Sequence, residues 1–176
     1  MKKLYLSLSG VFGTLPGIST IIAGLLTPPG KKLLFGGVTE AIGCLALLIL
    51  WTNREQLLKQ DRKKATKVAA LLGITFLLFI ILYISLSSYC IITVEDRGTV
   101  YYPIWTNAEL TQLIDNAGGR PAALEKYGLN AIIEKTQNPE INLILTDIIL
   151  LLTFQAIFTI LTIAFGMLGF RKESEL

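Results

Sequence analysis

Four long apolar segments divide the chain, and each is long enough to cross a membrane as a helix. They run from Leu4 to Leu26, from Leu33 to Trp51, from Val68 to about Tyr89 and from Leu143 to Phe170. A helix rises about 1.5 Å per residue, so about 20 apolar residues cover the hydrocarbon core of a bilayer. The pattern therefore predicts an all-α membrane protein built as a bundle of four transmembrane helices.

The polar segments between these runs predict the domain organisation. Residues 1–89 would hold the first three helices, with a basic loop at residues 53–67. Residues 143–176 would hold the fourth helix and a short tail. Residues 90–142 are too polar to continue the membrane-spanning pattern. We expect them to form a small α+β cap outside the membrane, between the third and fourth helices.

The start of this cap reads as a hairpin followed by a helix. The runs Cys90–Val94 and Thr99–Ile104 are rich in β-branched and aromatic residues and flank a Glu-Asp-Arg-Gly turn, a pattern typical of a hairpin. Thr106 and Glu109 have the spacing of a capping box, which predicts a helix that Gly118 and Gly119 end.

Two further short helices follow in the cap. Pro121 suits the first turn of one, which Gly128 stops, and Asn130 would cap the next. Cys44 and Cys90 fall at different inferred depths, so we expect two free thiols and no disulfide. A core of this size is marginal alone, so we expect the cap to contact the membrane surface, the bundle or another subunit. The predicted contact consists of three aromatic residues: Tyr101, Tyr102 and Trp105.

Basic residues predict the orientation. Lys and Arg concentrate at both termini and in residues 53–67, and the positive-inside bias places these segments in the cytoplasm of an inner or plasma membrane. Arg62, Lys63 and Lys64 lie beside the third apolar run, where they would contact anionic lipid headgroups.

Each apolar run carries small residues at helical spacing. Because lipid gives no hydrophobic drive for helix association, close backbone approach and side-chain hydrogen bonds hold such helices together. We therefore expect the helices to pack through a set of glycines: Gly10, Gly13, Gly17, Gly36, Gly43, Gly166 and Gly169.

Glu40 stands near the middle of the second apolar run, where an ionisable side chain has to face protein or water. Counting from the outer helix ends puts Ser19, Tyr83 and Gln155 at a similar depth. We expect these four residues to form one intramembrane polar layer. Glu40 would then be a structural acid that fixes helix rotation, a proton- or cation-linked site, or a contact to a lipid or ligand headgroup.

Asp147 lies at the outer end of the fourth run, where it would be a solvated or helix-N-terminal carboxylate or part of an acidic entrance. The sequence has no histidine, and we find no phosphate-binding glycine loop, metal cluster or nucleophile–base pair in it. We therefore expect no enzyme and no cofactor. Acidic residues outnumber basic ones in the cap, which argues against nucleic acid as a partner.

Composition supports the membrane interpretation. Hydrophobic residues make up 52% of the 176 residues, the mean hydropathy is +0.60, and charged residues are only 16%, against about 25% in soluble domains. The resulting hypothesis is a non-enzymatic integral membrane protein in a lipid bilayer. Its cap would bind a partner or self-associate, and its bundle would anchor or transmit. The alternative is a small homo-oligomeric channel or pore-forming effector with Glu40 and Gln155 in a polar path.

Overall fold

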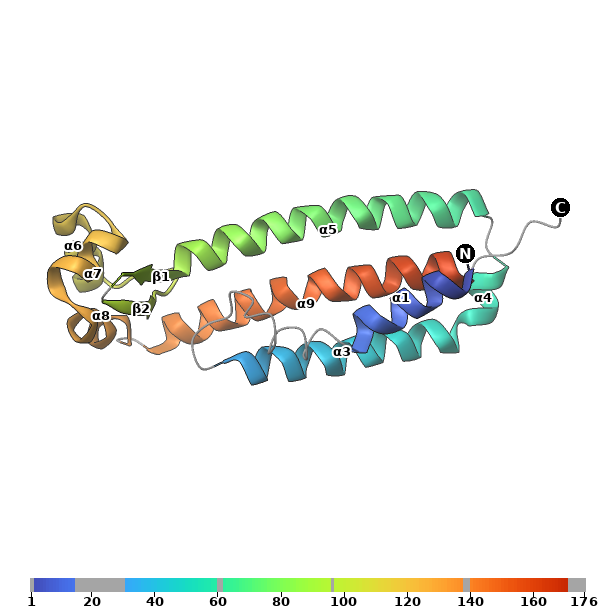
Figure 1. Ribbon diagram of the computed structural model, residues 1–176, viewed down its shortest axis with the longest axis horizontal. Coiled ribbons are helices and arrows are strands. Elements are labelled where there is room, and N and C mark those ends of the chain that lie inside the picture. The colour runs from blue at the N-terminus through green and yellow to red at the C-terminus, as the bar shows by residue number, and fades with distance from the viewer. Residues whose placement is uncertain (1, 15–30, 60–61, 96, 138–139, 171–176) are drawn as a thin grey trace. The chain divides into compact units, whose positions relative to one another are not determined.

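The computed structural model describes residues 2–14, 31–59, 62–95, 97–137 and 140–170 (Figure 1). Within them the fold is mostly helical with one small sheet. Three of the described helices are long and apolar enough to cross a membrane, over Leu33–Thr52, Lys63–Cys90 and Glu140–Phe170. The first predicted span is described only as α1, Lys2–Thr14, so a fourth span stays a prediction.

The membrane-length helices are α3 (Lys32–Thr52), α5 (Arg62–Cys90) and α9 (Glu140–Phe170). Their apolar parts match the predicted runs. α5 begins before Val68 because the Arg, Lys and Ala residues ahead of it are strong helix formers. The predicted basic loop also contains a one-turn helix, α4 (Arg54–Leu58).

The described residues fall into two compact units. The first holds α1, α3, α4, α5 up to Leu82 and α9 from Thr153. The second holds Lys31, the end of α5 from Tyr83, residues 91–137 and α9 up to Leu152.

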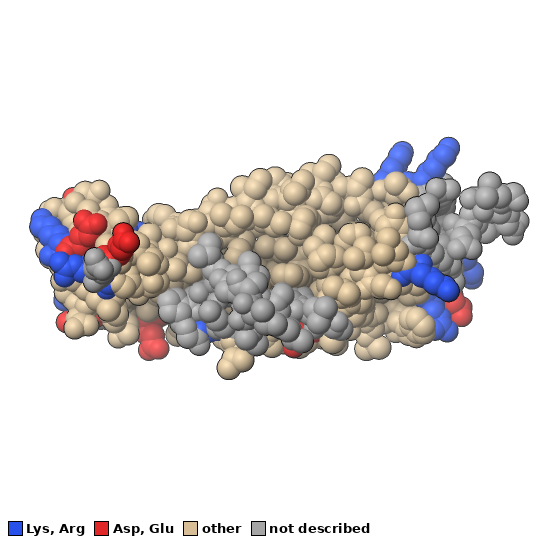
Figure 2. Space-filling view, viewed as in Figure 1, with Lys and Arg blue, Asp and Glu red and all other residues tan. Residues whose placement is uncertain are grey.

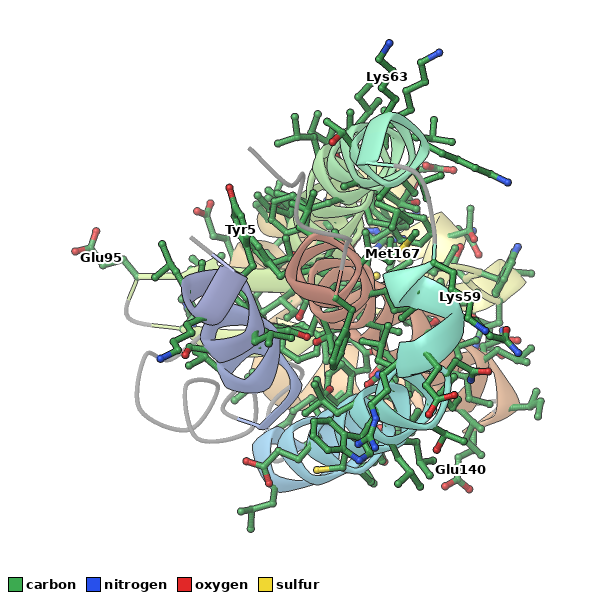
Figure 3. The ribbon with its side chains drawn as sticks, turned by 90° about the vertical axis from the view of Figure 1, so that its right-hand side faces the viewer. Tyr5, Lys59, Lys63, Glu95, Glu140 and Met167 are labelled. Atoms are coloured by element: carbon green, nitrogen blue, oxygen red, sulfur yellow. The ribbon has the colours of Figure 1, made fainter. Side chains whose placement is uncertain are left out.

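In the first unit α1 packs against α3 and α9 (Figure 3). Gly13 and Gly43 bring the backbones of α1 and α3 into contact. The Ser9 hydroxyl on α1 donates to the carbonyl oxygen of Thr162 on α9 at 2.8 Å. Phe35 on α3 meets Phe154 on α9 with ring centroids 5.9 Å apart. Small residues and a hydroxyl therefore set the spacing of these helices.

The second unit contains a folded domain at residues 91–137, which we call the hairpin–helix domain. Strands β1 (Ile91–Val94) and β2 (Gly98–Tyr101) pair antiparallel, with Ile91 opposite Tyr101, which confirms the predicted hairpin. Three short helices follow: α6 (Ala108–Ala117), α7 (Arg120–Tyr127) and α8 (Leu129–Thr136). Together they enclose a core of Val100, Tyr102, Leu110, Ala123, Leu124 and Ile132.

The glycine signals in this domain are confirmed. Gly118 follows α6 with a left-handed φ of 87°, a conformation that glycine adopts without strain. α7 carries Pro121 in its first turn and ends at Gly128.

Two predicted helix caps are wrong. Asn107, and not Thr106, caps α6, because its side-chain oxygen accepts from the backbone N–H of Leu110 at 2.7 Å. The Thr106 hydroxyl instead hydrogen-bonds that of Thr111. α8 already begins after Gly128, so Asn130 lies inside this helix and does not cap it.

Candidate functional site

Arg120 is the charged centre of the second unit. It opens α7, and only 8% of its surface is exposed. Its Nη1 donates to the carbonyl oxygen of Tyr89 at 2.7 Å, and its Nη2 donates to that of Pro103 at 3.2 Å. The guanidinium lies 3.7 Å from the ring centroid of Tyr89 and 5.1 Å from that of Tyr102. These contacts join the last turn of α5, the exit of β2 and the start of α7. We call this group the Arg120 clamp.

Local sequence explains how Arg120 reaches this position. Gly118 and Gly119 both have positive φ, at 87° and 135°, which lets the chain reverse between α6 and α7 within two residues. A cation in the first turn of a helix is disfavoured by the helix dipole. Backbone carbonyls and aromatic faces provide the compensation here, and Arg120 forms no ion pair with any described carboxylate.

Tyr102 completes the clamp from inside the domain core. Its side chain is fully buried, and its hydroxyl donates to the carbonyl oxygen of Arg120 at 3.1 Å. Burial raises the pKa of the Tyr102 hydroxyl, and the positive charge of Arg120 opposes this shift. The phenol is therefore a neutral donor that fixes the backbone of α7.

A second polar contact lies at the start of α9. Asp147 is 9% exposed and forms an ion pair with Lys31, the residue before α3. Burial, followed by the negative charge of Asp147, raises the pKa of the nearby Tyr101 hydroxyl. The Tyr101 hydroxyl and Asp147 Oδ1 are both buried without a hydrogen-bond partner among the described residues. The prediction of a solvated or helix-N-terminal Asp147 is wrong, because the side chain is buried beside Lys31 and lies beyond the first turn of α9, which begins at Glu140.

Thr146 ties the domain to the same helix. Its hydroxyl accepts from the backbone N–H of Ile104 at 2.9 Å and donates to the carbonyl oxygen of Asn142. The chain that leaves β2 is therefore held both to α5, through Arg120, and to α9, through Thr146.

Three of the four residues of the predicted polar layer lie among the described residues, on α3, α5 and α9. Glu40 is half-buried on α3, and Ser19 lies outside the described residues. Gln155 is buried on α9, where its Nε2 donates to the Thr159 hydroxyl at 2.7 Å. Tyr83 is buried on α5 and belongs to the second unit. In the described chain no hydrogen bond joins Glu40 to Gln155, so the layer stays a prediction.

The predicted packing glycines differ in their surroundings. A Cβ on Gly43 would collide with the Gly13 backbone. On Gly166 it would meet Leu50, and on Gly169 it would meet Leu6. Gly36 is buried, Gly10 has open space at the Cβ position, and Gly17 lies outside the described residues.

The structure describes two of the three basic residues that were predicted to contact lipid headgroups, and all three aromatic residues of the predicted cap contact. Lys63 and Lys64 are exposed at the start of α5, and Figure 3 shows Lys63 pointing away from the helices. Figure 2 shows basic side chains gathered at this end of the first unit; the Arg62 side chain is not among the described ones.

The three aromatic residues of the predicted cap contact differ in exposure. Tyr102 belongs to the domain core, Tyr101 is half-buried, and Trp105 is 51% exposed. Trp105 is therefore the exposed ring of the predicted contact.

Sequence reasoning missed Arg120 and the Lys31–Asp147 pair. The sequence did contain a signal for this pair, because Lys31 and Asp147 lie at the same inferred membrane boundary and carry opposite charges.

The described residues hold no group of three or more His, Cys, Asp or Glu side chains that could bind a metal. Comparison with models of known protein families, with characterised protein sequences and with solved structures gives no match to this chain.

Proposed function

We propose that this chain is an integral membrane protein whose hairpin–helix domain binds a protein partner or a second copy of the chain. Its helices would anchor that domain and transmit the bound state. Three membrane-length helices and a domain with its own core support this proposal. The observation that carries it is the Arg120 clamp, which fastens the domain to the last turn of α5.

The clamp would couple a movement of the hairpin–helix domain to the end of α5. Moving the domain relative to the end of α5 would strand a buried guanidinium, which costs several kcal/mol. The hydrogen bond from Ile104 to Thr146 couples the same loop to α9. A force applied to the domain would therefore reach two membrane-length helices through side-chain contacts.

Trp105 is the contact that we assign to the partner. It is 51% exposed in the loop between β2 and α6, directly after the residues held by the clamp. Trp is enriched among the residues that dominate binding energy in protein interfaces. A partner that covers Trp105 would act on the loop that Arg120 and Thr146 hold.

Site-specific photo-cross-linking tests this function. A photoreactive amino acid at position 105 is compared with one at Gln112, which is exposed on α6. Both variants are irradiated in native membranes and as purified protein in liposomes. A discrete adduct from position 105 alone supports recognition. Formation in liposomes identifies a second copy, and formation only in native membranes identifies another protein. Equal, diffuse labelling from both positions would contradict the proposal.

A channel is the second candidate, and polar atoms in the first unit favour it. Gln155 Oε1 is buried without a hydrogen-bond partner among the described residues, and Glu40 is half-buried on α3. Oligomerised bundles would place these groups along a polar path. Liposome ion flux that falls in Glu40→Gln, together with a ring-sized oligomer in detergent, supports this function. A monomer without flux contradicts it.

A further inference from the structure

A groove of about 400 Å³ opens on the first unit between α1, α3 and the end of α9. This volume lies within the range of about 300 to 1,000 Å³ typical of small-molecule sites. Its wall includes Leu6, Cys44, Leu48 and Phe170. Side-chain packing over glycines shapes it, because Leu50 lies over Gly166 and Leu6 over Gly169.

The lining of the groove suits a hydrocarbon chain. The residues that line it include no charged side chain. Its one hydroxyl, on Ser9, already donates to the carbonyl oxygen of Thr162. The remaining lining consists of aliphatic and ring surfaces and the weakly polar thiol of Cys44, and it matches an acyl chain in a segment long and apolar enough to span a membrane.

One end of the groove is aromatic and basic. Trp51 lines it, is 59% exposed and meets the Phe170 ring edge-on at 6.2 Å between centroids. The Arg54 guanidinium stacks 4.6 Å from the centroid of Trp51. Trp is enriched at the headgroup level of a bilayer. Lys59, labelled in Figure 3, follows as the residue that ends α4, and Glu55 is the acid in the first turn of that helix.

We propose that this groove binds one acyl chain of an anionic phospholipid, with the phosphate held at Arg54. The inference rests on the membrane insertion proposed above. The chain fills the apolar groove, and the guanidinium that caps Trp51 meets the negative headgroup. A basic side chain near the surface attracts anionic lipid, and a guanidinium binds phosphate through paired N–H donors. Headgroup charge therefore decides which lipid occupies the groove.

Quenching of Trp51 fluorescence by brominated lipid tests the site. The chain contains two tryptophans, so Trp105→Phe leaves Trp51 as the single reporter. The protein is reconstituted in mixed phosphatidylglycerol and phosphatidylcholine bilayers, with bromine on one lipid at a time. We expect the brominated anionic lipid to show roughly three- to six-fold tighter binding than the zwitterionic one.

Three variants separate the parts of the proposal. Arg54→Gln removes the headgroup partner and should bring the preference close to one. Cys44→Phe fills the groove and should do the same while Arg54 remains. Lys67→Gln removes an exposed basic residue of α5 that does not line the groove, and should keep the preference. If Cys44→Phe loses its folded near-UV circular dichroism signal, Leu48→Phe on the exposed edge of the groove replaces it.

The outcomes distinguish this site from membrane insertion itself. Equal quenching by both lipids in the parent protein overturns the anionic site but leaves insertion intact. A preference that persists when the groove is filled overturns the role of the groove. No quenching by either lipid contradicts insertion of this part of the chain, and the proposed function fails with it.

Discussion

The Arg120 guanidinium stacks on the ring of Tyr89, 3.7 Å from its centroid, and also hydrogen-bonds the carbonyl oxygen of that residue. Tyr89 lies in the last turn of α5, where carbonyl oxygens have no partner within the helix. Arg120 therefore caps α5 from another element. The negative end of the α5 dipole offsets the cost of a cation in the first turn of α7. Arg120 thus provides a donor for a carbonyl oxygen at the end of α5, and the end of α5 stabilises a positive charge that the first turn of α7 disfavours.

Arg120→Lys should destabilise the hairpin–helix domain although it keeps the charge. A single ammonium cannot reach two carbonyl oxygens and cover two rings as the planar guanidinium does. We expect a loss of about 2–4 kcal/mol in the free energy of unfolding. Chemical unfolding of the full chain in detergent micelles, followed by near-UV circular dichroism, measures it. Arg97→Lys, on the exposed hairpin turn, is the matched control and should change stability by less than about 0.5 kcal/mol.

Tyr101 and Tyr102 are neighbours whose hydroxyls differ in their partners. Tyr102→Phe removes a buried hydrogen bond to the Arg120 carbonyl and should cost about 1–2 kcal/mol. Tyr101→Phe removes a buried hydroxyl that lies beside Asp147 and makes no hydrogen bond of ordinary geometry within the described residues, so it should cost less than Tyr102→Phe. The same unfolding experiment compares the two variants. A larger loss in Tyr101→Phe would show that its hydroxyl bonds Asp147.

Much of the fold could be predicted from local patterns in the sequence. The apolar runs located three membrane-length helices, and the paired β-branched runs located the hairpin. Gly118 and Gly128 ended their helices because a left-handed residue is a local requirement that glycine meets. The caps could not be predicted from local sequence, since Thr106 and Asn107 are both capping residues and only geometry decides between them.

The site was harder to predict because its contacts are long-range. Arg120 reaches Tyr89 across 31 positions in the sequence, and Lys31 reaches Asp147 across 116. Neither contact has a periodicity, so no window of sequence contains both partners. The cost of burying Glu40 in hydrocarbon, by contrast, follows from its position in an apolar run alone. The partners of Glu40 depend on helix rotation, which apolar runs do not specify.

Gly43→Ala should weaken the contact between α1 and α3. A Cβ at this position would collide with the carbonyl oxygen of Gly13, and a backbone atom cannot move away as a side chain can. We expect a loss of about 1–3 kcal/mol. Gly37→Ala is the matched control in the same helix, because a Cβ there has no atom within 4 Å. Thermal unfolding in micelles should separate the two variants, and equal behaviour would contradict the close contact.

Glu109 and Lys135 form an exposed ion pair with an N–O distance of 2.8 Å, which predicts a pH dependence. The hydrogen bond from Lys135, followed by its charge, lowers the pKa of Glu109 below its usual 4.5. The same contact raises the pKa of Lys135 above its usual 10.5. The Glu109 part of the stabilisation is present above pH 4.5 and is lost as the pH falls through the lowered pKa. The Lys135 part is present below pH 10.5 and is lost as the pH rises through the raised pKa.

Carbon NMR of labelled Glu side chains in the full chain measures this effect, with the Glu109 resonance assigned by Glu109→Gln. In Lys135→Met the pKa of Glu109 should return to about 4.5, because both lowering contacts come from Lys135. Lys126→Met is the matched control: this exposed lysine bonds the Asn116 carbonyl and should leave Glu109 unchanged. An unchanged Glu109 pKa in Lys135→Met would mean that α6 and α8 do not hold this pair in solution.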